Sequence, residues 1–89
     1  MESKKYIFKG FVQGVGFRSF VHYHALKLDV IGSVKNLCTG DVEVIASADS
    51  EILALFFTRI HKGPSGSHIE DIIEEDLTAN QIGKGFRIL

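Results

Sequence analysis

The sequence predicts an α+β fold in which two helices cover one face of an antiparallel sheet. Two observations predict it: β-branched and aromatic segments alternate with two segments of helical spacing, and short glycine-rich or polar stretches separate them. A chain of 89 residues has room for one core, so residues 1–89 are expected to form a single domain. With 45% hydrophobic residues, this domain can bury its core without disulfides.

A strand and a helix open the chain. Apolar and polar side chains alternate over residues 4–12, and the β-branched and aromatic content of this segment suits a strand. A Gln-Gly-Val-Gly stretch at residues 13–16 ends the alternation. Apolar residues then recur at helical spacing, which predicts a helix from Phe17 to Leu28.

The middle of the chain predicts a hairpin followed by a second helix. Two β-rich segments, Ile31–Leu37 and Asp41–Ser47, flank a turn-sized gap that contains a glycine. Asp49 or Ser50 is expected to cap a helix that carries an apolar stripe. A Gly-Pro pair at residues 63–64 provides the stop for that helix.

Two further strands complete the pattern. Residues 67–77 predict a strand, and a bulge is expected within it because its isoleucines do not share one parity. Residues 86–89 predict a short last strand. The order β-α-β-β-α-β plus a terminal strand is that of the ferredoxin-like sandwich, with two helices on one face of an antiparallel sheet.

Composition and charge exclude several classes of protein. The single cysteine, Cys38, excludes an internal disulfide and a Cys-rich zinc cluster, and it favours a cytoplasmic location. The longest apolar run, Ile52–Phe57, is too short to span a membrane, so no membrane association is expected. A net charge of -1 gives no broad attraction to nucleic acid, so no nucleic-acid partner is expected.

The segment from Gly10 to Arg18 carries the strongest chemical signal. Here a strand ends in a glycine-rich turn and a helix begins, so consecutive backbone N–H groups can converge on an anion. Arg18, in the first helical turn, can offer two N–H groups to a phosphate. No Asp or Glu occurs from Ser3 to Leu28, a bias that favours a small anion. On these residues alone, an ordinary strand-to-helix turn with a surface arginine remains an alternative.

Other motifs have less support. A dinucleotide fingerprint would need glycine at Ser19, and the Gly-Lys-Ser/Thr of a nucleotide-binding loop is missing. His22 and His24 are two residues apart on a helix and point in different directions, so no metal site is expected there. An aromatic segment similar to an RNA-recognition octapeptide falls on the first strand, whereas that octapeptide belongs on the third.

Two signatures of the sequence resemble those of the acylphosphatase family. The first is Gly10-x-Val12-Gln13-Gly14-Val15-Gly16-Phe17-Arg18. The second is Gly32-x-Val34-x-Asn36-Leu37-x-x-Gly40-x-Val42-Glu43. The similarity continues through Lys62-Gly63-Pro64 and Gly85-Phe86, so it covers nearly the whole chain. The sequence departs from the family pattern at a helix end, a packing position and a turn: Asp29, Ser33 and Cys38-Thr39.

The resemblance implies that the chain hydrolyses the carboxyl-phosphate bond of acyl phosphates to a carboxylate and inorganic phosphate, without a metal, cofactor or covalent intermediate. It implies that Arg18 binds the phosphoryl group and that Asn36 orients the attacking water. The resemblance assigns the rest of phosphate binding mainly to backbone N–H groups of one loop: Gln13, Gly14, Val15, Gly16, Phe17 and Arg18. A carboxylate leaving group, with a pKa of roughly 4, needs no general acid.

Two alternatives stay open on the sequence. A non-catalytic ferredoxin-like module could bind phosphate or a phosphorylated ligand in the same place, because a fold alone does not establish function. Asn36 ends a strand beside a turn, where an asparagine side chain can instead hydrogen-bond the backbone. A monomer that acts on a small molecule is expected.

Overall fold

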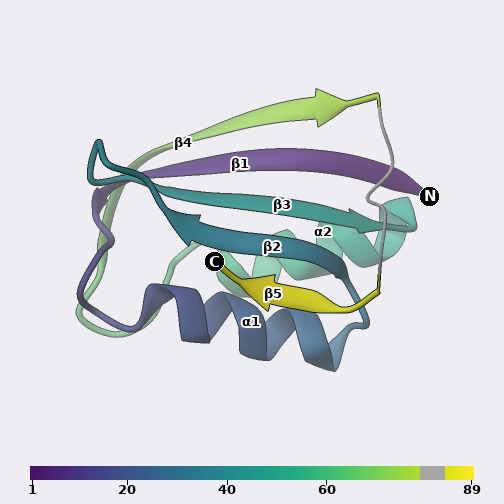
Figure 1. Ribbon diagram of the computed structural model, residues 1–89, viewed down its shortest axis with the longest axis horizontal. Helices are drawn as coiled ribbons and strands as arrows, with labels where there is room; N and C mark the ends of the chain where they lie inside the picture. Colours follow the sequence, from purple (N-terminus) through teal and green to yellow (C-terminus); the bar gives the residue numbers. More distant parts are fainter. Residues whose placement is uncertain (79–83) are drawn as a thin grey trace.

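In the part of the chain that the structure describes, five strands form one sheet, and two helices cover one of its faces (Figure 1). The computed structural model describes residues 1–78 and 84–89. The elements follow the predicted order: β1 (Glu2–Phe11), α1 (Phe17–Lys27), β2 (Ile31–Asn36), β3 (Val42–Ala48), α2 (Ser50–Ile60), β4 (His68–Leu77) and β5 (Phe86–Ile88). The ferredoxin-like prediction is therefore confirmed.

The sheet is mixed, not wholly antiparallel as predicted. Its strand order is β4-β1-β3-β2-β5, and the first four of these strands pair antiparallel with their neighbours. β5 pairs in parallel with β2, where Gly32 lies opposite Phe86. β4 runs antiparallel to β1 and therefore ends at the end of the sheet where β2 begins. β5 begins at that same end and so runs parallel to β2. Four residues of strand pattern, residues 86–89, contain no information about that direction.

The ends of most elements agree with the predicted ranges to within one or two residues. The bulge expected in the fourth strand is present, because Lys9 pairs with Asp71 while Gly10 pairs with Ile69, which leaves Glu70 as the extra residue. Asp49 occupies the cap position of α2, but its side chain makes no capping hydrogen bond. The predicted position of that cap is right and the predicted bond is absent.

The core lies between the helices and the covered face of the sheet. Alternate residues of β1 and β3 face the helices, and both helices contribute apolar side chains to the same cluster. The ring of Phe8 on β1 lies 5.0 Å from the ring of Phe17, the first residue of α1. Burial of a side chain of this size stabilises the fold by roughly 1.5–3 kcal/mol. This contact fixes the start of α1 against the end of β1.

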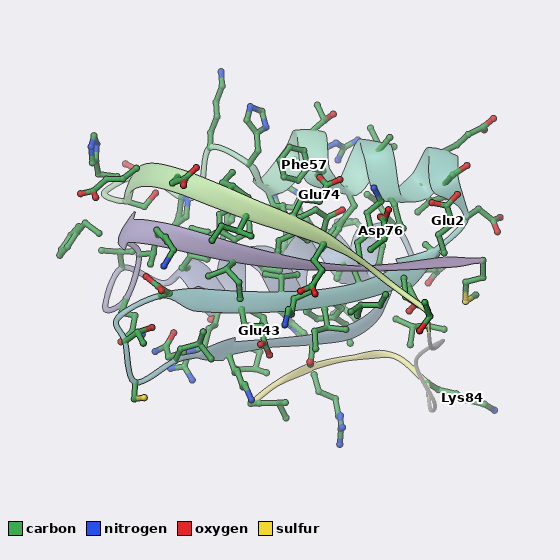
Figure 2. All side chains as sticks on the ribbon, turned by 90° about the horizontal axis from the view of Figure 1, so that it is seen from above. Glu2, Glu43, Phe57, Glu74, Asp76 and Lys84 are labelled. Carbon is green, nitrogen blue, oxygen red and sulfur yellow. The ribbon has the colours of Figure 1, made fainter. Side chains whose placement is uncertain are left out.

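Three of the five acidic residues of β4, Glu74, Glu75 and Asp76, form ion pairs with lysines of β1. The ammonium of Lys4 lies 2.9 Å from the carboxylate of Glu74 and 3.3 Å from that of Asp76. Figure 2 shows Glu74 and Asp76 on the side of the sheet that carries α2, whereas Glu43 lies on the opposite side. Exposed ion pairs of this kind contribute about 0–1 kcal/mol each, so they add little to the stability of the fold. The acidic residues instead make β4 a charged edge strand.

The end of α1 generates a prediction about stability. Val30 N–H donates to the carbonyl of Ala25 (2.9 Å) and Asp29 N–H to that of Leu26 (3.4 Å), the two bonds of a Schellman motif. Asp29 therefore takes a left-handed φ of 55°. That conformation costs an L-residue about 1–2 kcal/mol, a cost that glycine does not have. A glycine also gives the unfolded chain more conformational freedom, which reduces the gain in stability by about 0.4–1 kcal/mol.

Asp29→Gly should accordingly raise the free energy of unfolding by about 0.5–1 kcal/mol, or the melting temperature by roughly 2–8 °C. Thermal and urea unfolding measure the change. Asp29→Asn is the matched control, because it removes the charge but keeps the Cβ, and we expect a smaller gain. An unchanged or lowered midpoint for the glycine variant would show that the Asp29 conformation carries no strain.

Candidate active site

Residues 13–18, which we call the 13–18 loop, include most of the connection between β1 and α1 and the first two residues of α1. This segment turns by means of two left-handed glycines. Gly14 has a φ of 75° and Gly16 a φ of 78°, and Gly16 is the residue that precedes the helix. Other L-residues rarely adopt such values, so the glycines let the loop make this turn. The first helical hydrogen bond runs from Phe20 N–H to Gly16 C=O (3.0 Å). The N–H groups of residues 17–19 therefore have no acceptor within the helix.

The start of α1 favours a bound anion. Its first turn contains no acidic residue, whereas the first turn of α2 contains Glu51. The aligned peptide dipoles place a partial positive charge at a helix N-terminus, and an acidic residue there would offset it. Arg18 adds a full positive charge at the same place. Of the two helices, α1 thus has the more electropositive start.

A hollow of about 110 Å³, the site hollow, lies in front of this helix start. Residues of the loop, of the first helical turn and of β2 line it: Val12, Gly14, Gly16, Phe17, Arg18, Ser19 and Asn36. Asn36 reaches it because β1 and β2 both run antiparallel to β3 and so end at the same end of the sheet. In Figure 1 the loop that leaves β1 and the turn that follows β2 both lie at the left end of the sheet.

The Arg18 side chain makes one hydrogen bond to the segment that follows β5. Its Nη1 atom donates a hydrogen bond to the carbonyl oxygen of Leu89 at 3.1 Å. Leu89 N–H in turn donates to the carbonyl of Val34 on β2 at 2.8 Å. A guanidinium has five N–H donors, so this bond leaves donors for a ligand.

Asn36 is the exposed last residue of β2 and lines the site hollow. Within the part of the chain that the structure describes, no side-chain hydrogen bond involves Asn36. Its amide oxygen and NH₂ group are therefore available to a ligand or a water molecule. The alternative in which this side chain bonds the hairpin backbone finds no such bond among the described residues.

The residues predicted for phosphate binding do not all line the site hollow. Gly14, Gly16, Phe17 and Arg18 line it. The side chains of Gln13 and Val15 do not. Gln13 hydrogen-bonds carbonyl groups of the β2–β3 turn, and Val15 packs against the core.

Sequence reasoning missed two residues that line the hollow and one contact beside it. Val12 forms the buried wall of the hollow, and Ser19 presents an exposed side chain in the first helical turn. The sequence could have indicated Ser19 as a site residue, because it directly follows Arg18 in the first turn of the predicted helix. The contact of Arg18 with Leu89 was not predictable, because it depends on the parallel pairing of β5 with β2.

The described residues offer neither a metal site nor a membrane-spanning helix. Within residues 1–78 and 84–89, no three His, Cys, Asp or Glu side chains are grouped so that they could hold a metal ion. None of the helices described is long and apolar enough to cross a membrane. Cys38 is free and exposed, and it does not line the site hollow.

Comparisons with known proteins agree on one family. Residues 4–88 match the family model for acylphosphatase. The acylphosphatase of Vibrio vulnificus is 37% identical over 86 residues, which cover 97% of this chain and 94% of the relative. The crystal structure of acylphosphatase from Bacillus subtilis has a TM-score of 0.95 at 34% identity and covers 100% of this chain and 99% of that one.

A larger structure contains the same fold. The crystal structure of T. kodakarensis HypF matches with a TM-score of 0.83 at 27% identity, over 99% of this chain but 12% of that one. The fold described here therefore also resembles a small part of a longer protein. The family match, by contrast, spans nearly the whole of this chain and nearly the whole of the Vibrio and Bacillus relatives. The chain belongs to the acylphosphatase family, enzymes that hydrolyse acyl phosphates.

Proposed function

We propose that the chain hydrolyses acyl phosphates without a metal ion, and that the 13–18 loop and Arg18 bind the phosphoryl group while Asn36 orients the attacking water. The observation that carries the proposal is the site hollow itself, which has Arg18, the start of α1 and Asn36 around one small space. In the reaction the water oxygen bonds to phosphorus and the bond from phosphorus to the acyl oxygen breaks. The carboxylate leaves with the electron pair of that bond.

The phosphoryl group is bound by fixed donors. The N–H groups at the start of α1 have no acceptor within the helix, and Arg18, which donates one hydrogen bond to Leu89, lines the same hollow. Negative charge spreads over the phosphoryl oxygens in the transition state of phosphoryl transfer. Donors that already point at these oxygens stabilise that charge without having to reorganise during the reaction.

The chemistry of the leaving group explains why the site needs no acid. A carboxylate, the conjugate base of an acid with a pKa of roughly 4, departs without protonation. Among the described residues that line the hollow there is no His, Cys, Asp or Glu. The proton of the attacking water passes to a phosphoryl oxygen of the substrate. The site therefore acts through position and charge.

The Asn36 amide suits the remaining task. Its oxygen can accept a hydrogen bond from water, and its NH₂ group can donate one, so a single side chain can fix the orientation of a water molecule. The residue comes from β2 and lines the same hollow as the loop that is proposed to bind the phosphoryl group. Binding and water orientation would thus be carried by separate segments of the chain.

We also propose that residues 1–89 act as a single acylphosphatase-like domain, a cytoplasmic monomer that takes a small acyl phosphate, releases inorganic phosphate and does not act on nucleic acid. The described residues that line the site hollow supply both the phosphoryl-binding donors and the Asn36 amide, so the proposed mechanism requires no residue from a second subunit. One exposed free cysteine suits a reducing compartment. A net charge of -1 gives little attraction to nucleic acid.

Release of phosphate from acetyl phosphate tests the activity directly. Turnover should continue in excess EDTA, and simple alkyl phosphate monoesters should be largely spared, because their poor leaving groups require an acid that the site lacks. Turnover that stops with EDTA and returns with one divalent ion would contradict the metal-independent mechanism. Equal kcat/KM on both substrate classes would show that an acid participates.

Arg18→Gln should lower the rate by about a hundredfold or more, because a fixed positive donor is lost from both the ground state and the transition state. Inhibition by inorganic phosphate should weaken in parallel. Steady-state kinetics with phosphate as a competitive inhibitor measure both effects, with circular dichroism to check folding. A folded variant with normal rate and phosphate affinity would remove Arg18 from the proposed binding site.

Asn36→Ala should lower kcat by about a hundredfold while KM and phosphate inhibition change little, because water is oriented mainly in the transition state. The melting temperature should stay close to that of the unmodified chain. A large drop in melting temperature, with activity that recovers on cooling, would instead assign Asn36 a structural role in the hairpin.

A further inference from the structure

The Gln13 side chain joins the two segments that form the site hollow. Its Nε2 atom donates hydrogen bonds to the carbonyl of Leu37 at 2.8 Å and to the carbonyl of Asp41 at 2.9 Å. Both protons of one NH₂ group are thereby used. Leu37 directly follows Asn36, so the bond reaches the residue next to the proposed water-orienting side chain.

The two carbonyls that Gln13 contacts belong to the closing residues of the β2–β3 turn. Leu37 N–H donates to Asp41 C=O at 2.8 Å, and Gly40 N–H donates to Leu37 C=O at 3.1 Å. Each carbonyl therefore accepts one bond from within the turn and one from Gln13. The side chain binds a turn that is already closed, so its effect is to fix the position of the turn relative to the 13–18 loop.

An ion pair strengthens the same connection. The ammonium of Lys9, on β1, lies 2.9 Å from the carboxylate of Asp41, whose side chain is only 15% exposed. Thr39 Oγ1 also donates to that carboxylate at 3.0 Å. The hydrogen bond from Lys9 lowers the pKa of the Asp41 carboxyl, which keeps it charged at neutral pH. Asp41 is therefore bound twice: its carbonyl accepts a hydrogen bond from Gln13, and its carboxylate pairs with Lys9 on β1.

The sheet alone does not fix this relation. β3 separates β1 from β2, and its last pairs on this side are Val42 with Phe8 and Val42 with Asn36. The loop and the turn both extend beyond these pairs. Among the described residues, the side-chain hydrogen bonds that connect residues 9–13 with residues 37–41 are those of Gln13 and Lys9. A displacement of about 1 Å between reacting groups can cost about a hundredfold in rate.

We propose that Gln13 is a positioning residue that acts on catalysis through Asn36. Its side-chain amide holds the β2–β3 turn so that the Asn36 amide faces the phosphoryl group bound by the loop. The inference rests on the proposed function of Asn36. The backbone N–H of Gln13 is unaffected by a change of side chain, so substitution separates this role from any backbone contact with phosphate.

Gln13→Met tests the proposal with a side chain of similar length that cannot donate hydrogen bonds. We expect kcat to fall about ten- to hundredfold, with KM and the inhibition constant of inorganic phosphate within about twofold of those of the unmodified chain. If phosphate affinity falls as much as kcat, Gln13 supports the loop itself and the proposal is wrong. An unchanged kcat in a folded variant would also overturn it.

Gln13→Glu adds a readout that depends on pH. A carboxylate cannot donate to either carbonyl and is repelled by both, so kcat at neutral pH should fall at least as far as in Gln13→Met. Once protonated, the introduced carboxyl group could donate one hydrogen bond, so the ratio of this variant's kcat to that of the unmodified chain should rise as the pH falls towards about 4–5. The methionine variant should show no such rise, and a parallel profile for the two variants would contradict the proposal.

A double-variant cycle with Asn36 tests whether Gln13 acts through that residue. Once Asn36→Ala has removed the amide, adding Gln13→Met should lower kcat by less than about twofold further. If the double variant instead loses kcat by the product of the two single-variant factors, the two residues act independently and the proposal is contradicted. If Asn36→Ala alone leaves kcat unchanged, the proposed function of Asn36 fails; if it lowers kcat but Gln13→Met does not, only the present inference fails.

Thr39→Val is the matched control, because it removes a hydrogen bond within the same turn but leaves the bonds between turn and loop. Its kcat should stay within about twofold of the unmodified chain. The melting temperatures of all variants show whether they are folded at the assay temperature. A kcat for Thr39→Val as low as that for Gln13→Met would show that any disturbance of the turn has the same effect, which would overturn a specific role for Gln13.

Discussion

Burial of Val12 and Phe17, which flank the glycine-containing turn at residues 13–16, is the interaction on which the rest of the site depends. Val12 is fully buried and Phe17 is 2% exposed, with its ring against that of Phe8. With both ends held in the core, the short connection between them has to turn sharply, and the left-handed glycines make that turn possible. The hydrophobic core therefore orders the N–H groups at the start of α1 before any ligand binds, so little ordering entropy is left to lose on binding.

The second half of the site is held by the sheet. β1 and β2 run in the same direction on either side of β3, so the end of β2 must emerge beside the end of β1. This topology brings Asn36 to the loop although β1 and β2 do not pair with each other. A small chain can therefore place an amide opposite an anion-binding helix start with one βαβ unit and one hairpin. A reaction with a good leaving group needs little more than such placement.

Much of this arrangement could be predicted from the sequence, because the predicted features depend on residues that are close together along the chain. Helical spacing after Gly16 and the unequal parity of the isoleucines around Ile72 predict α1 and the bulge of β4, because both are properties of neighbouring residues. The parallel direction of β5 and the bond from Arg18 to Leu89 could not be predicted, because they depend on which strand edge the chain reaches after β4. The contacts of the Gln13 side chain could not be predicted either, because its partners are main-chain carbonyls of the β2–β3 turn, which is distant in the sequence.

A titration with inorganic phosphate, followed by the amide signals in ¹H–¹⁵N NMR spectra, tests the central claim most directly. If the loop and the start of α1 form the anion site, the largest shifts should occur at the amides of residues 14–19 and at the Arg18 guanidinium, with one common dissociation constant. Residues at the start of α2 should shift little, because an acidic residue occupies its first turn. Shifts centred on α2 or spread evenly over the surface would contradict the account.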